Sequence, residues 1–136
     1  MRVSNGLAAL FAGLTLSACV NDPQVTATTT LLGHEWLVED IAAGGVIDYA
    51  RTTIEFGADG RVSGDTGCNR YFASFQTEGA KLQISDAGAT RRACPPAVMD
   101  QETRFLKVLG EVERYEIDET NMLLLTTPAG VSLKAR

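Results

Sequence analysis

The chain has 136 residues, which is enough for one domain, and its 45% hydrophobic and 21% charged residues are ordinary proportions for a globular protein. The formal net charge is −5, and acidic and basic residues are interspersed along the chain. Its aromatic residues do not alternate with a basic stripe, so nucleic acid is not an expected partner.

The first 18 residues have the pattern of an export signal. Arg2 supplies a positively charged start, and the apolar run 7–16 is shorter than a bilayer-spanning helix. The run ends in Leu16-Ser17-Ala18-Cys19, which resembles the bacterial lipobox, where the cysteine is acylated and becomes the new N-terminus. The alternative is an ordinary signal cleaved near Ala18.

We therefore expect residues 1–18 to be a signal peptide and Cys19 to be lipidated, which would anchor the protein in a membrane. Several acyl chains give lasting anchorage where one chain does not. Val20, in place of aspartate, favours the outer membrane by resemblance to enterobacterial sorting, with the protein facing the periplasm. Residues 19–30 are threonine-rich and contain Pro23, which predicts a flexible tether before a domain at 31–136.

Short alternating apolar runs, separated by glycines, follow from Leu31 onward. They predict a mainly β (α+β) fold with about eight antiparallel strands, arranged as a sandwich or as a small closed or nearly closed barrel. Asp59-Gly60 marks the clearest hairpin turn, and pairing of the last strand with the first would leave no exposed edge. The strands are expected at 34–40, 52–56, 61–64, 71–75, 81–85, 112–117, 122–125 and 131–134.

The apolar period changes after Cys94 and predicts one helix over about residues 96–109. Pro95 and Pro96 suit a helix start, and Gly110 is expected to cap the end. The expected buried face recurs at three and four residues. Its members are Val98, Met99, Glu102, Phe105, Leu106 and Leu109.

Of the three cysteines, Cys68 and Cys94 remain when the lipid-bearing Cys19 is set aside. An even pair in an oxidising compartment favours a disulfide. Two free buried thiols, a redox pair and half of a metal site are the alternatives. A redox pair is more typically C-x-x-C, and a zinc site needs four ligands, whereas His34 is the only histidine and is expected at the surface.

Two motifs identify a resemblance when they occur in this order. They are Gly67-Cys68-Asn69-Arg70-Tyr71 and Thr90-Arg91-Arg92-Ala93-Cys94-Pro95, with Gln101-Glu102 following the second. From Leu31 to Lys134 the chain resembles the META domain family, also called HslJ-like. The resemblance implies a small lipocalin-like barrel with a helix, in envelope lipoproteins linked to heat shock and antibiotic tolerance. It implies no reaction, since the family has no established catalytic residues.

Glu102 is unusual because it lies on the expected buried face of the helix. A buried carboxylate is costly unless it is paired and hydrogen-bonded. We hypothesise that it accepts hydrogen bonds from Arg91 or Arg70, or from backbone amides near Asn69. The alternative places the Glu102 carboxylate at the edge of the face, in water. Asn69 itself is expected to stabilise a turn.

The sequence offers no arrangement of nucleophile, base or metal ligands, so we expect no enzyme, no cofactor and no metal. The motif residues Asn69, Arg70, Thr90, Arg91 and Glu102 are given structural roles. The expected function is that of a monomeric, non-enzymatic envelope scaffold with an envelope protein as partner, in stress or antibiotic tolerance. The alternatives are a carrier of a small apolar ligand inside the barrel, or an inhibitor of a periplasmic or host hydrolase through the loop 87–92.

Overall fold

The computed structural model describes residues 31–136. The expected signal peptide, the lipidated Cys19 and the tether lie outside the described residues. Within them, eight strands and one helix follow one another. They are β1 (Glu35–Ile41), β2 (Thr53–Phe56), β3 (Arg61–Asp65), β4 (Arg70–Glu78), β5 (Lys81–Ala89), α2 (Pro96–Glu111), β6 (Arg114–Ile117), β7 (Leu123–Thr126) and β8 (Ser132–Ala135).

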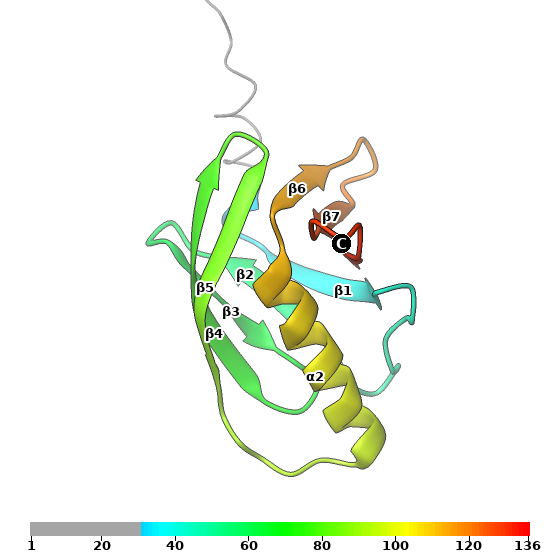
Figure 1. The fold of residues 1–136 in the computed structure, drawn as a ribbon. Coiled ribbons are helices and arrows are strands. Elements are labelled where there is room, and N and C mark those ends of the chain that lie inside the picture. Colours follow the sequence, from blue (N-terminus) through cyan, green and yellow to red (C-terminus); the bar gives the residue numbers. More distant parts are fainter. Residues whose placement is uncertain (1–30) are drawn as a thin grey trace, which may run out of the picture.

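The strands form a closed antiparallel ring in chain order, as the sequence predicts (Figure 1). Each strand pairs with the next, and β8 pairs back with β1 through Ile41 and Leu133. The predicted hairpin is confirmed, with Gly60 at a φ of 79° in the turn between β2 and β3. Ring closure leaves no long strand edge without a neighbour except where β5 leaves β6.

The junction between β5 and β6 is the weak point of the ring. Lys81 and Arg114 are their one pair in register. Beyond this pair the two strands diverge, and α2 runs alongside the opening that they leave (Figure 1). The helix packs against β5, β8 and β1. It therefore completes the wall where strand pairing stops.

Alternating side chains of the strands fill the interior. Figure 1 shows the helix lying against the ring, and Phe105 of α2 enters the same core, with its ring 5.3 Å from that of Tyr71 in an edge-to-face arrangement. Burial raises the pKa of the Tyr71 phenol, whose hydroxyl donates to the Thr53 carbonyl oxygen at 2.9 Å. The largest fully buried apolar side chains include Tyr71, Phe56, Phe105, Leu31, Ile41, Ile54, Leu82 and Leu109.

The helix differs from its prediction in its end and in its rotation. Gly110 does not cap it, because α2 continues to Glu111 and the N–H of Val112 bonds to the Leu109 carbonyl oxygen. Met99, expected on the buried face, is 43% exposed, whereas Gln101 is fully buried. The helix is rotated because Gln101 finds hydrogen-bond partners in the interior, so its burial is not costly.

Gly64 allows a close approach of backbone segments. A Cβ atom at this position would lie 2.1 Å from the carbonyl oxygen of Thr53 and 3.0 Å from the Tyr71 ring. Both neighbours are buried, so neither can move aside. Gly110 is the opposite case, since no atom lies within 4 Å of a Cβ built there.

These two glycines make a matched pair of substitutions. Gly64→Ala is expected to lower the free energy of unfolding by about 2–3 kcal/mol through overpacking. Gly110→Ala is expected to raise it by about 0.5–1 kcal/mol through better helix propensity. Guanidinium denaturation followed by circular dichroism measures both. Equal effects of the two substitutions would contradict the packing at Gly64.

Candidate functional site

The carboxamide of Asn69 joins three segments of the chain. Asn69 directly precedes β4 and is 4% exposed. Its Nδ2 donates to Glu102 Oε2 at 3.0 Å, on α2. Its Oδ1 accepts from Thr90 Oγ1 at 3.0 Å and from the backbone N–H of Arg92 at 2.6 Å, both in the segment after β5. One side chain thereby holds a turn, a connecting segment and the helix together.

Glu102 has an internal partner as hypothesised, but that partner is not an arginine. Its carboxylate accepts hydrogen bonds from Asn69 Nδ2 and from the hydroxyl of Thr66. Arg70 and Arg91 are exposed and make no ion pair with Glu102, so that part of the hypothesis is wrong. Neutral donors serve here because Glu102 is only half-buried and keeps part of its hydration.

The orientation of the Asn69 amide is determined by its partners. Exchanging its oxygen and nitrogen would bring the carbonyl oxygen against the Glu102 carboxylate and the NH2 group against the Arg92 N–H. Both contacts would then be repulsive, so the network permits one orientation. The turn role expected for Asn69 is therefore joined by a long-range role that connects residues 33 positions apart.

Gln101 provides a second polar connection, which the pattern of the sequence did not predict. Its Nε2 donates to the Ala50 carbonyl oxygen at 2.9 Å and to Thr52 Oγ1 at 3.0 Å. Its Oε1 accepts from the backbone N–H of Ile47 at 2.7 Å. Gln101 thereby fastens the loop between β1 and β2 to the helix. Its position directly before Glu102 in the motif was the available signal.

The disulfide between Cys68 and Cys94 lies beside this network, as the cysteine count predicts. It connects the turn before β4 with the residue just before the prolines that begin α2. Asn69 Nδ2 lies 3.4 Å from the Cys68 sulfur. The start of the helix is therefore held by a covalent bond and by the Asn69–Glu102 hydrogen bonds together.

Three arginines surround a surface depression on the outer side of the same network. Arg70 belongs to β4, while Arg91 and Arg92 belong to the segment after β5. The depression has a volume of about 610 Å3, and we call it the arginine groove. Its other lining residues are Asp65, Cys68, Asn69 and Thr90.

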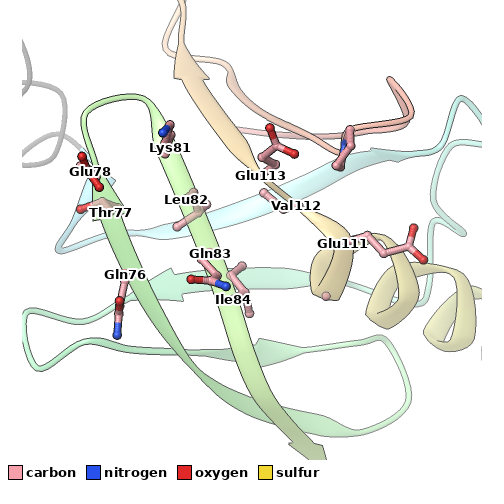
Figure 2. A pocket seen from close by; sticks show the side chains of 12 residues that line it. Gln76, Thr77, Glu78, Lys81, Leu82, Gln83, Ile84, Glu111, Val112 and Glu113 are labelled. Carbon is pink, nitrogen blue, oxygen red and sulfur yellow. The ribbon is translucent and has the colours of Figure 1, made fainter.

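A second depression, the hairpin cleft, lies near the opening between β5 and β6 and measures about 460 Å3. Figure 2 shows the β4–β5 hairpin on one side of it and the end of α2 on the other. Leu82, Ile84 and Val112 form a buried apolar floor. The rim is exposed and polar, and includes Gln76, Glu78, Lys81, Gln83, Glu111 and Glu113.

The remaining features to locate are groups of metal-ligating side chains, long apolar helices and the single histidine. Within residues 31–136, no group of three or more His, Cys, Asp or Glu side chains is arranged to hold a metal ion. No helix in that part of the chain is long and apolar enough to cross a membrane. His34 is exposed and contacts the Trp36 ring edge-to-face at 5.0 Å.

The fold and site together define a small closed antiparallel sheet with one helix. A disulfide and the Asn69–Glu102 hydrogen bonds attach the helix to the sheet. The META domain model matches residues 29–135. The chain therefore belongs to the META domain family. No curated protein sequence matches it.

Three solved structures have a similar fold. An NMR structure of a protein from Burkholderia xenovorans is 24% identical, with a TM-score of 0.65, over 93% of this chain and 97% of that one. A second NMR structure is also 24% identical, with a TM-score of 0.62, over 76% and 87% of the two chains. A crystal structure of a DUF4847 family protein from Bacteroides vulgatus is 17% identical, with a TM-score of 0.56, over 77% and 92%. These likenesses concern the fold alone.

Glu102→Gln tests the connection between helix and turn. It should lower the free energy of unfolding by about 1–2 kcal/mol, because an amide replaces the charged acceptor of the Asn69 and Thr66 donors. The control is Asp100→Asn, an exposed position on the same helix, which should change stability by less than about 0.5 kcal/mol. Denaturation midpoints that are equal for the two variants would contradict the role given to Glu102.

Reduction tests the disulfide. The two cysteines are 26 positions apart, and opening a loop of that size should cost about 3.5 kcal/mol of stability in the chain-entropy description. Guanidinium denaturation with and without excess dithiothreitol measures the difference, and the double variant Cys68→Ser with Cys94→Ser should reproduce the reduced protein. A midpoint that does not respond to the reductant would refute the structural role.

Proposed function

We propose that this META domain protein is a non-enzymatic lipoprotein of the bacterial cell envelope, which acts as a stable scaffold and interaction domain in stress or antibiotic tolerance. The observation that carries the proposal is the use made of the motif side chains. The side chain of Asn69 donates a hydrogen bond to Glu102, and Cys68 and Cys94 form the disulfide. A carboxylate, a carboxamide and two cysteines, which act as catalytic groups in many enzymes, here stabilise the fold.

The disulfide also supports an extracytoplasmic location, because such bonds persist in oxidising compartments. The lipobox-like Leu16-Ser17-Ala18-Cys19 supports lipidation at Cys19 and an outer-membrane position facing the periplasm. A polar tether at residues 20–30 would hold the domain away from the membrane surface.

The filled interior favours a scaffold over a carrier of apolar ligands. Large side chains from every part of the ring meet in one core, including Phe56, Phe105 and Leu133, each with no exposed surface. The hairpin cleft reaches the size range of ligand pockets, but its rim is polar and exposed. An apolar molecule would find apolar contacts there only on the floor.

Inhibition of a hydrolase is the second candidate. Residues 87–89 of the loop expected at 87–92 belong to β5, so the exposed segment that favours this candidate begins at Thr90. Arg91 is exposed, while its neighbours are held by Asn69 and by the Cys94 disulfide. A loop that is rigid before binding loses less entropy on entering a cleft. Arg91→Ala would separate the two candidates, since it should abolish inhibition of a susceptible hydrolase and leave a scaffold that binds elsewhere intact.

Lipidation is tested directly by mass spectrometry of the full-length gene product expressed in a bacterium that processes lipoproteins. The mature chain should begin at Cys19 and carry a diacylglyceryl thioether and an N-acyl group, and it should fractionate with the outer membrane. Cys19→Ser is the control and should remain unacylated and lose membrane attachment. A mature chain with an unmodified Cys19 thiol would refute the lipoprotein assignment.

A further inference from the structure

The arginine groove gathers positive charge on a protein that is acidic overall. Arg70, Arg91 and Arg92 line it with one carboxylate, that of Asp65, so the groove carries a net charge of +2. Neither ion pair found among residues 31–136 involves these three arginines, since they join Arg51 to Glu35 and Lys107 to Glu111. Three like charges held together repel one another, and an anionic ligand would remove that repulsion.

The backbone around the groove is held by the buried network. The backbone N–H of Arg92 bonds to Asn69, and its guanidinium Nη2 donates to the Cys68 carbonyl oxygen at 2.7 Å. Two hydrogen bonds join Arg70 to Thr90. The backbone N–H of Thr90 donates to the Arg70 carbonyl oxygen, and the backbone N–H of Arg70 donates to Thr90 Oγ1. The backbone of the groove and the Arg92 guanidinium are therefore held before a ligand binds, which lowers the conformational entropy lost there on binding.

Donor groups remain available for a ligand. The guanidinium groups of Arg70 and Arg91 make no hydrogen bond with residues 31–136, and the backbone N–H of Arg91 makes none in that part of the chain either. Arginine presents a planar set of N–H donors that suits the oxygens of phosphates and carboxylates. A net charge of +2 and three guanidinium groups match a dianion with three free oxygens better than a carboxylate.

The groove continues into a neighbouring depression of about 420 Å3, which shares Asp65, Arg70 and Arg92 with it. This extension is lined also by Tyr49, which is 76% exposed, and by Arg51. Glu35 and Glu55 balance its charge, so the extension does not itself attract anions. An aromatic ring beside a charged groove offers a surface for the organic part of a ligand.

We propose that the arginine groove binds the phosphate group of a phosphomonoester, with the attached organic group lying toward Tyr49. The site holds whether or not Cys19 is lipidated, so a failure of the lipoprotein assignment leaves this inference standing. A soluble phosphomonoester and the headgroup of a phosphatidic-acid-like lipid share the required chemistry.

The test is a calorimetric titration of the full-length protein in dodecyl maltoside, without phosphate in the buffer. The probes are inorganic phosphate, phenyl phosphate and dihexanoyl phosphatidic acid, with dihexanoyl phosphatidylcholine as the control for lipid contact. Both phosphomonoesters should bind more tightly than inorganic phosphate, and phosphatidylcholine should not bind. Tighter binding of phosphatidic acid than of phenyl phosphate identifies a lipid headgroup as the source, and the reverse order identifies a soluble ester.

Variants locate the binding. Arg70→Gln and Arg91→Gln should each weaken phenyl phosphate binding about tenfold, because each removes a charged donor. Asp65→Asn should strengthen it, since it removes the one repelling charge of the groove and keeps the Oδ1 acceptor for Gly67 N. Arg114→Gln is the control, because Arg114 pairs with Lys81 at the far end of β5, about 27 Å away along nine residues.

Folding of every variant is checked by its thermal melting temperature, since Arg70 and Arg91 are exposed. Absence of binding by the unmodified protein at millimolar phenyl phosphate would overturn the proposal. Binding that Arg114→Gln weakens as much as Arg91→Gln would overturn it also, because only overall charge would then matter. Equal affinity for inorganic phosphate and both esters would refute the position given to the organic group.

Discussion

The hydrogen bonds between the Asn69 carboxamide and the Glu102 carboxylate determine where the helix lies on the sheet. Strand pairing closes the ring only weakly at one junction, because β5 and β6 have one pair in register. Helix α2 must complete the wall, and its N-terminal half is held by Glu102 and by the disulfide at Cys94. Its C-terminal half is held by Phe105 and Leu109 in the common core. Hydrogen bonds and the disulfide thus orient the N-terminal half of the helix, and apolar packing orients its C-terminal half.

The hydrogen bonds of Asn69 affect both the interior of the protein and its surface. On the inner side, donors and acceptors are matched, and within residues 31–136 no buried side-chain nitrogen or oxygen is left without a partner. On the outer side, the segment 90–92 is held with its arginines toward solvent. A single asparagine therefore links the stability of the fold to the charge pattern of the surface, and this link connects the scaffold to the proposed anion site.

The two ends of β5 are physically different. At its C-terminal end the chain passes into the disulfide-held segment and the arginine groove. At its N-terminal end β5 pairs with β6 through Lys81 and then diverges from it, and the hairpin cleft lies near this opening (Figure 2). The first end combines positive charge with rigid backbone, which is suited to a specific charged ligand. The second has a polar rim and an apolar floor of buried side chains.

The strands, the β2–β3 hairpin and the approximate span of the helix could be read from the sequence, because period and turn residues are local properties. The disulfide followed from the number of cysteines and their expected compartment. The partner of Glu102, the burial of Gln101 and the gathering of Arg70 with Arg91 could not be read in this way. They depend on how α2 is rotated about its axis and on which distant segments the ring brings together. Only the tertiary structure decides that rotation, since the apolar positions of the helix tolerate several and the buried polar partners select one.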